Sequence, residues 1–573
     1  MTVKIKRRQH KPASFSDAIH PLLQRIYAAR NIVTEEELDY SLKHLPDFKG
    51  LKGIGDAVEL LFHALKESQR ILIVADFDAD GATSCALAVR GLRAMGARDV
   101  RYVVPNRFEY GYGLTPEIVE VAARELPDLL ITVDNGIASN EGVARAREKG
   151  IKVLITDHHL PGEQLPDANA IVNPNQPCDT FPGKSLAGVG VMFYVLMALR
   201  ARLRETDWFE QQGLAFPKLA ELLDLVALGT VADVVPLDRI NRILVAQGLA
   251  RIRNGVGCAG IRAIALVAGR TWENLVSSDL GFAIGPRLNA AGRLDDMSLG
   301  IECLLCDDES EAMQLATELD QLNRERREIG DLMLEEAIQI LDKLDLAEKE
   351  IPFGLSLYQP EWHQGVVGIL ASRIKERYHR PVIVFADTDE GEIKGSARSV
   401  NGVHIRDLLD SVATKNPGLI SKFGGHAMAA GLSLPKENYE DFSTAFDQEV
   451  RNHLRLEDLE GVIISDGKLS SEDLTLEVAE LIRFAGPWGQ AFPEPIFDGV
   501  FELVNIRIVG EKHLKMILRQ PGSESLIDGI AFNVTNEAWP ESTSQVEIVY
   551  RLEVNEFRDN RNPQLLIQHI VPL

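Results

Sequence analysis

The sequence predicts an α/β protein with three parts: a domain built on a parallel sheet, a smaller α/β domain joined to it by a long helix, and a C-terminal β-barrel. Three observations support this fold class. Strand-like apolar runs alternate with helical stretches over residues 71–173, a proline-free run with helical spacing covers 309–344, and short strands separated by turn residues follow 461. A chain of 573 residues has room for about three or four domains.

The first part alternates regularly between the two kinds of element. Strand-like runs are expected at 71–75, 100–105, 129–133 and 153–156, and helical spacing occurs at 82–95 and 139–149. This alternation favours a parallel sheet covered by helices on both faces. Residues 219–228 are interpreted as a buried helix that runs into Gly229-Thr-Val-Ala-Asp233.

The run 309–344 is expected to form one helix of about 36 residues, hence about 54 Å long. Such a helix is too long to pack within one lobe, so an interdomain connection is the simplest interpretation. A second α/β unit follows, and strands of a small barrel or sandwich are expected beyond it. The predicted domains are 1–50 (N-terminal extension), 51–305 (parallel-sheet domain), 306–346 (connecting helix), 347–457 (second α/β domain) and 458–573 (barrel), with barrel strands at 501–509, 513–518, 545–554 and 565–570.

Composition gives little direct information on partners. The net charge of −24 does not indicate nucleic-acid binding, and the basic cluster at residues 4–11 is interpreted as a flexible, solubilising tail. Cys303 and Cys306 have no second cysteine pair for a zinc site, so reduced thiols and a cytoplasmic location are expected. The longest apolar run, 186–199, is too short to span a bilayer, so no membrane association is expected.

The candidate metal-binding and catalytic residues stand at the ends of the predicted strands and of one predicted helix. Each group stands where an apolar run stops, and in open α/β sheets sites form at the carboxyl ends of the strands. The groups are Asp76, Asp78 and Asp80; Asp134; Asp157, His158 and His159; and Asp233, which closes the helical run.

Two alternatives to a catalytic metal centre fit less well. Asp76-x-Asp-x-Asp-Gly matches the start of an EF-hand loop, but the twelfth position, which requires glutamate, is Leu87. A phosphatase with an aspartyl nucleophile also begins with a strand and Asp-x-Asp, but its downstream lysine and acidic pair cannot be placed. A role as helix cap or turn former stays open for each acid alone and fits the whole set poorly.

Charge balance favours a site for two cations. Asp78, Asp80, Asp134 and Asp233 supply four negative charges, which two divalent ions would neutralise, and His158 adds a neutral nitrogen ligand. Oxygen-rich ligands with one imidazole suit Mn²⁺ or Mg²⁺. Two such ions about 3.5–4 Å apart assist in-line phosphoryl displacement.

Together these motifs resemble the DHH phosphoesterase superfamily. The resemblance rests on Asp-His-His after a strand, on Asp-x-Asp-Gly, on Val-Asp-Asn-Gly and on Gly-Thr-Val-Ala-Asp, and the segment Gly424-Gly425-His426-Ala-Met-Ala-Ala-Gly431 resembles the companion DHHA1 domain. With the long helix, the motif Gly285-Pro-Arg-Leu-Asn-Ala-Ala-Gly-Arg293 and the β-rich tail, the chain is similar to the branch of single-strand-specific 5′→3′ DNA exonucleases. The resemblance implies an OB-like barrel.

The resemblance also implies roles for the site residues. The metal ligands would be Asp78, Asp80, Asp134, His158 and Asp233, with Asp134 bridging both ions. His159 would point at the scissile phosphate, and Asp157 would orient an imidazole. Many members carry a histidine where this chain has Val74; Asp76 is a candidate substitute ligand, and water is another.

Substrate contacts are expected elsewhere. Hydroxyl, guanidinium, imidazole and close backbone N–H groups suit phosphate binding, and an arginine among aromatic residues suits a single strand. The expected residues are Ser396, Arg398, Gly424, Gly425 and His426, with Arg107 and with Arg287, Asn289 and Arg293. If Arg107, Ser396 and Arg398 hold a terminal 5′-phosphate, the metals cut the next phosphodiester and release a 5′-mononucleotide.

Two rival functions stay open at this stage. One is another DHH enzyme, such as an oligoribonuclease or cyclic-dinucleotide phosphodiesterase, and the other is an inactive DNA-binding scaffold. The resemblance implies single-stranded DNA as partner, work beside a helicase and a single-strand-binding protein in recombination and repair, and a monomeric state.

Overall fold

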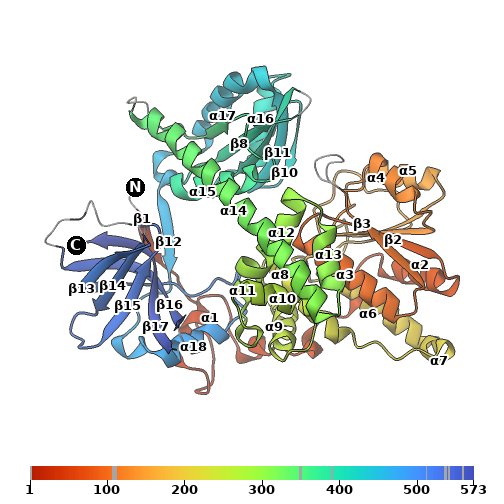
Figure 1. Cartoon of the computed structure of the whole chain (residues 1–573), viewed down its shortest axis with the longest axis horizontal. Helices are drawn as coiled ribbons and strands as arrows, with labels where there is room; N and C mark the ends of the chain where they lie inside the picture. The colour runs from red at the N-terminus through yellow and green to blue at the C-terminus, as the bar shows by residue number, and fades with distance from the viewer. Residues whose placement is uncertain are drawn as a thin grey trace. The chain divides into compact units, whose positions relative to one another are not determined.

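The computed structural model describes residues 3–105, 113–346, 351–388, 391–510, 513–534, 539, 543–557 and 560–573. The chain forms two compact units (Figure 1). The larger unit comprises Arg7–Asp320 and Ile464–Leu573, and the smaller unit comprises Met1–Lys6 and Gln321–Ile463. Each unit is described by itself below.

The predicted parallel sheet is present in the larger unit. Its strand order is β3-β2-β4-β5-β6, and every neighbouring pair is parallel. The strands are β2 (Arg70–Ala75), β3 (Asp99–Val103), β4 (Leu129–Val133), β5 (Lys152–Thr156) and β6 (Ala170–Val172). Of these, the three-residue β6 was not predicted as a separate strand.

Helices cover both faces of this sheet. Alternate side chains of a strand point to opposite faces, and Leu72, Val74 and Leu130 pack with residues of α4 (Pro116–Ala123) and α5 (Asn140–Glu148) in one buried cluster. The predicted buried helix is confirmed as α8 (Leu223–Ala232). The other helices of this unit are α1 (Pro21–Ala28), α2 (Ile54–Lys66), α3 (Ala79–Ala94), α6 (Gly188–Glu205), α7 (Trp208–Gln212), α9 (Arg239–Arg253), α10 (Ala259–Val267), α11 (Ser277–Asp279), α12 (Gly285–Leu294), α13 (Ser298–Leu305) and α18 (Leu476–Phe484).

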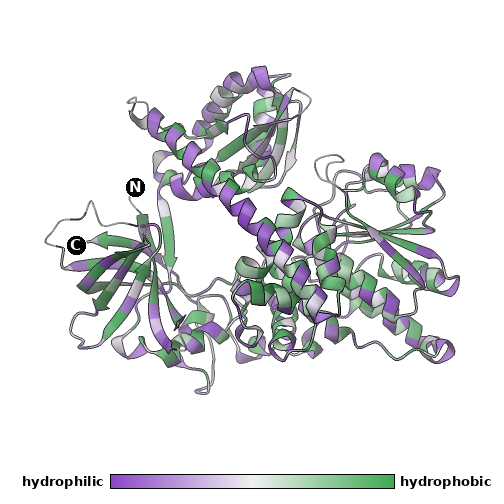
Figure 2. Ribbon diagram, viewed as in Figure 1, coloured by the Kyte–Doolittle hydropathy of each residue, from purple (hydrophilic) through white to green (hydrophobic). Residues whose placement is uncertain are grey.

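The predicted long helix is confirmed as α14 (Glu309–Leu346), which ends two residues later than expected. Charged and polar residues dominate it (Figure 2). Its buried positions include Ala312, Ala316 and Leu319, whose spacing of three or four residues places them on one face. The division between the two compact units falls inside this helix, after Asp320.

The smaller unit is the second α/β unit that the sequence predicts. Its sheet has the order β10-β11-β9-β8-β7, in which β7 and β8 are parallel and the other pairs antiparallel. The strands are β7 (Leu355–Tyr358), β8 (Val382–Asp387), β9 (Glu392–Arg398), β10 (Lys422–Gly425) and β11 (Ala429–Pro435), and the helices are α15 (Val367–Tyr378), α16 (Ile405–Lys415) and α17 (Tyr439–His453).

The C-terminal strands close into a barrel of order β13-β14-β15-β17-β16, as expected. The strands are β13 (Phe497–Val509), β14 (His513–Arg519), β15 (Leu526–Ala531), β16 (Gln545–Phe557) and β17 (Asn560–Pro572). The sequence did not predict β15, which carries Asp528 and Gly529 in its interior, residue types that are depleted in strands. β15 closes the barrel by pairing in parallel with β17.

The N-terminal basic cluster is not a free tail, so that interpretation was wrong. Residues Val3–Arg7 form β1, which pairs with β12 (Gly461–Ser465). The Arg7 guanidinium donates to both oxygens of Asp498, at 3.2 and 2.8 Å, and Arg8 lies 3.5 Å from Asp466. Local acids therefore neutralise these charges within the protein.

All five cysteines are free, and Cys85, Cys258 and Cys303 are buried. Among the residues that the structure describes, no helix is both long enough and apolar enough to cross a membrane.

Candidate metal centre

The predicted acids and histidines converge at one edge of the parallel sheet. Asp76 follows β2, Asp134 follows β4, and Asp157 begins the segment after β5. These three strands are neighbours in the sheet, so their carboxyl ends bring the three segments together. Asp233 joins them from a different direction, as the residue directly after α8.

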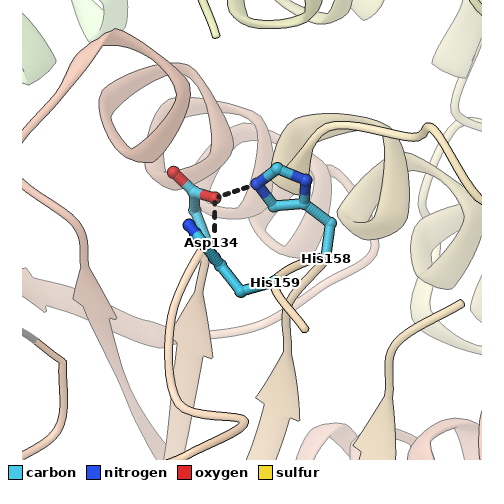
Figure 3. A group of neighbouring side chains, drawn as sticks. All are labelled: Asp134, His158 and His159. Atoms are coloured by element: carbon cyan, nitrogen blue, oxygen red, sulfur yellow. Dashed lines mark ion pairs between the residues drawn. The ribbon is translucent and has the colours of Figure 1, made fainter. Parts of the chain in front are cut away.

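Three overlapping sets of ligand atoms occur there, each set lying within 4.8 Å. Asp134 and His158 each belong to two of the three sets. They are Asp76, Asp78 and Asp134; Asp134, His158 and His159; and Asp80, His158 and Asp233. In Figure 3 the Nε2 atom of His158 lies 3.1 Å from Oδ1 of Asp134, and it is 3.5 Å from Oδ2 of Asp233. All six predicted ligands therefore lie in one cluster.

The electrostatics of the cluster favour a bound cation. Burial, and then the charges of neighbouring acids, raise the pKa of Asp134 well above its usual value, and the same two causes raise that of Asp233. Burial and the adjacent Asp78 raise the pKa of Asp80 to about 7. Acids that repel one another in a desolvated site need positive charge to stay ionised. Carboxylate oxygens with one imidazole fit Mn²⁺ or Mg²⁺.

The backbone at the centre is held in an uncommon conformation. Asp134 has a φ of 62°, in the left-handed region that non-glycine residues rarely adopt. Helix α6 closes against it: a Cβ on Gly188 would lie only 2.6 Å from the Cβ of Asp134. Strain of this kind persists where the surrounding packing determines the conformation, which is frequent at active sites.

Two of the acids also have structural roles. Oδ1 of Asp78 accepts the N–H groups of Asp80 and Gly81 at 2.9 and 3.0 Å, so it caps α3. Asp80 accepts from the first residues of α6, Gly188 at 2.6 Å and Val189 at 3.0 Å. The cap interpretation is thus correct for one oxygen of Asp78 and does not exclude the metal role. Sequence reasoning missed Gly188 and Val189, which are about a hundred residues from Asp80.

Asp157 orients an imidazole, and that imidazole belongs to His159. Oδ1 of Asp157 lies 2.7 Å from Nδ1 of His159, and Oδ2 accepts the N–H of Ile137 at 2.9 Å. Burial opposes protonation of His159, but the hydrogen bond and charge of Asp157 raise its pKa to about 9. The Asp157 side chain is 1% exposed and that of His159 is 30% exposed. The carboxylate is therefore held inside the protein, whereas the imidazole ring reaches solvent.

The three residues expected from the 285–293 motif have different surroundings. Arg287 is buried, forms an ion pair with Asp320 at 2.7 Å and donates to the carbonyl of Ala283. Arg287 therefore links α12 to α14 in this structure. From the sequence, the same residue was expected to contact a phosphate. Asn289 accepts the N–H of Ala79 through Oδ1 at 2.8 Å, and Arg293 is half-buried in the last turn of α12. Arg107 lies outside the described residues.

The phosphate-binding residues predicted for the smaller unit gather on adjacent strands. Ser396 of β9 and Gly424 of β10 both pair with Gly431 of β11. Nη1 of Arg398 donates to Oγ of Ser396 at 3.0 Å. Gly425 and the exposed His426 end β10.

Arg398 is a half-buried cation that has no acidic partner among the described residues. Burial lowers its pKa, and no carboxylate of the described residues forms an ion pair with it. A residue that sequence reasoning missed lies beside it: a Cβ on Gly368 would be 3.0 Å from Nη2 of Arg398 and 2.9 Å from Oγ of Ser396. Gly368 is in the first turn of α15, and the positive end of a helix dipole attracts anions.

Comparisons with known proteins recognise three successive parts of the chain. Three family models match the chain: the DHH family N-terminal domain at residues 70–230, the DHHA1 domain at 352–452 and the RecJ OB domain at 465–569.

Whole-chain relatives carry one common description. The chain is 56% identical to a single-stranded-DNA-specific exonuclease RecJ of Dickeya dadantii over the full length of both, and 53% identical to that of Escherichia coli, covering 100% of this chain and 99% of the relative. A crystal structure of RecJ from Thermus thermophilus in complex with Mn²⁺ has a TM-score of 0.80 and 31% identity, covering 100% of this chain and 80% of that one. The same protein in complex with Mg²⁺ has a TM-score of 0.73 and 29% identity, covering 99% and 78%. The chain belongs to the RecJ family of single-stranded-DNA-specific exonucleases.

Proposed function

We propose that this protein degrades single-stranded DNA from its 5′ end with two divalent cations, Mn²⁺ or Mg²⁺, and releases 5′-mononucleotides. The observation that carries the proposal is the convergence of six carboxylate and imidazole ligands at the sheet edge. The raised pKa values of Asp134 and Asp233 supply the physical reason why cations bind there. The whole-chain likeness to exonucleases of this specificity supports the substrate class.

Asp78, Asp80, Asp134, His158 and Asp233 are the proposed metal ligands. Asp134, a carboxylate with two oxygens that belongs to two of the three ligand sets, is the proposed residue that both ions would share. Bound divalent ions supply an activated water and stabilise both oxygens of the in-line displacement.

Asp76 is the proposed substitute for the histidine that many members of the superfamily carry. Val74, at that histidine's position, lies fully buried among core residues of the sheet face that α4 and α5 cover. Asp76 belongs to a ligand set with Asp78 and Asp134.

His159 is the proposed contact to the scissile phosphate. Asp157 holds its Nδ1, so the other ring nitrogen, Nε2, is the one that can donate to a phosphate oxygen. The raised pKa keeps the ring protonated at neutral pH, and a protonated imidazole stabilises negative charge on that oxygen.

Polarity is proposed to come from a 5′-phosphate site in the smaller unit. Ser396, Arg398 and Gly368 offer a hydroxyl, a half-buried guanidinium and a helix N-terminus. Gly424 and Gly425 lie on β10, which β11 separates from β9, and His426 follows β10. A half-buried cation without a carboxylate partner among the described residues suits an anionic ligand. Binding of the terminal phosphate restricts cleavage to the 5′ end. Arg107 and Arg293 are proposed as further phosphate contacts.

The barrel is proposed to bind the incoming strand, as OB folds do. We further propose that the protein works as a monomer in the cytoplasm, in recombination and repair, beside a helicase and a single-strand-binding protein. Its free cysteines are in keeping with a reducing compartment.

The decisive experiment compares substrates and one ligand variant. We expect Mn²⁺-dependent release of mononucleotides from long 5′-labelled single strands, and little hydrolysis of dinucleotides or cyclic dinucleotides. Asp134→Ala should lower the activity at least about 10³-fold, because it removes the carboxylate proposed to be shared by both ions. The circular-dichroism spectrum should stay unchanged. Preference for dinucleotides would favour the other DHH phosphodiesterases, and full activity of Asp134→Ala would contradict the two-metal centre.

A further inference from the structure

We propose that Asn289 is a positioning residue for the metal centre: through it and Gly292, helix α12 fixes the turn that presents Asp76, Asp78 and Asp80. The inference rests on the metal-ligand set proposed above. It concerns a helix that supplies no ligand to that set.

The first step is the hydrogen bonding at the start of α3. The first N–H groups of a helix have no partner inside the helix and must find one elsewhere. Oδ1 of Asp78 takes those of Asp80 and Gly81. The N–H of Ala79 is left, and it donates to Oδ1 of Asn289 at 2.8 Å, from a residue 210 positions along the chain.

The hydrogen bond from Ala79 to Asn289 also affects how Asp78 can be used. Ala79 is 1% exposed, so water does not reach its backbone readily. The Asn289 oxygen satisfies this N–H group from outside the turn. Asp78, whose Oδ1 already accepts two N–H groups, therefore keeps its other oxygen available to a metal.

The third step is an independent contact of the same helix. A Cβ on Gly292 would overlap the carbonyl oxygen of Phe77. Gly292 lies one turn after Asn289, so both face the same segment of chain. The backbone of α12 therefore touches the turn at Phe77 and the side chain of Asn289 holds it at Ala79, on both sides of Asp78.

The Asn289 amide has one hydrogen-bonding group to spare. Within the described part of the chain, its Nδ2 has no hydrogen-bond partner. The amide therefore could serve either the turn or the substrate, and only a variant that separates the two atoms distinguishes these roles. Asp at 289 keeps an acceptor for Ala79 and loses the donor, whereas Ala loses both.

The test is Mn²⁺ binding by the full-length protein without DNA, measured by the electron paramagnetic resonance signal of free Mn²⁺. Asn289→Ala should weaken binding about 10-fold or more, as is typical when a residue that orients metal ligands is lost. Gly292→Ala should weaken it as well, by displacing α12. Asn289→Asp should bind Mn²⁺ at least as tightly as the wild type, because the acceptor is retained.

Controls separate positioning from folding. Alanine is a better helix former than asparagine, so Asn289→Ala should not melt below the wild type through α12 itself. Asn254→Ala removes a side chain that, among the described residues, donates only to the carbonyl of Ala250 in α9. Gly55→Ala adds a methyl group in α2 that would have no described neighbour within 4 Å. Both variants should bind Mn²⁺ normally.

Two results would overturn the inference. Wild-type Mn²⁺ binding by both Asn289→Ala and Gly292→Ala would show that α12 does not position the ligands. Normal binding with a raised KM for DNA in Asn289→Ala and Asn289→Asp alike would make Asn289 a substrate contact instead. Failure of the wild type itself to bind Mn²⁺ would contradict the ligand set, which is a separate outcome.

Discussion

Single residues at the metal centre combine two tasks that are usually considered alternatives. Asp78 caps α3 through one oxygen, and Asp80 accepts two N–H groups of α6, while both belong to the ligand sets. Their identity was predictable because a residue at a strand end is a local feature of the sequence. Their supports were not, since Gly188 and Asn289 reach the turn from positions more than a hundred residues away.

The metal-free protein should lose stability as the pH rises from 6 to 8. The pKa of Asp80 is raised to about 7 and that of His159 to about 9, each above its unfolded value. Between the unfolded and folded values the folded state binds more protons, so stability falls with rising pH. Asp80 contributes from about pH 4 to 7, and His159 from about pH 6.5 to 9.

Thermal melting with EDTA and with saturating Mn²⁺ tests this expectation. The melting temperature in EDTA should be lower at pH 8 than at pH 6 by at least about 3 °C. Mn²⁺ should remove or reverse the trend, because it binds the ionised carboxylates. Asp80→Asn should flatten the EDTA curve. A metal-free melting temperature that stays constant or rises over this range would contradict the assigned protonation.

At the scale of elements, the sequence predicted those whose pattern is local and strong. The buried strands β2, β4 and β5 appeared as apolar β-branched runs, and α14 as a long periodic helix. β15 was missed because Asp528 and Gly529 interrupt its apolar residues, and because it is completed by pairing with β17, a contact that no local pattern encodes. The proximity of α15 to β9 through Gly368 appears only in the fold.

The close approach of the start of α15 to Ser396 and Arg398 of β9 predicts that loss of Arg398 affects only substrates with a 5′-phosphate. Arg398→Ala should reduce degradation of 5′-phosphorylated single strands by about 10- to 100-fold, since a charge-assisted contact of about 1.5–3 kcal/mol is lost. On 5′-hydroxyl strands the same variant should differ little from the wild type.

Arg406 of the same unit is a suitable control. It is exposed on α16 and forms no hydrogen bond with Ser396 among the described residues, so Arg406→Ala should leave degradation of both substrates unaffected. An equal loss by Arg398→Ala on phosphorylated and unphosphorylated strands would place Arg398 in folding or general backbone binding instead.

For the whole molecule, the sequence predicted the number of parts better than their grouping. Residues 1–50 were interpreted as an extension, yet Tyr27 stacks on Trp488 and donates to the carbonyl of Ala485 at 2.8 Å. The N-terminal segment from Arg7 onward, the parallel sheet and the barrel share one compact unit. Contacts over more than four hundred positions leave no periodic trace in the sequence, so composition alone made this segment resemble a tail.

The ion pair between Arg30 and Asp466 is the bond on which this grouping depends most. The guanidinium donates to both oxygens of Asp466 at 2.9 and 3.0 Å and to the carbonyl of Pro493 at 2.7 Å, with no exposed side-chain surface. Removing one partner of a buried pair leaves an uncompensated charge, which costs about 3–5 kcal/mol. Arg30→Ala should therefore destabilise the larger unit by that amount in urea unfolding. Arg101→Ala, which breaks exposed pairs with Asp99 and Glu125, should cost no more than about 1 kcal/mol. Equal losses for the two variants would mean that the N-terminal segment docks without help from this pair.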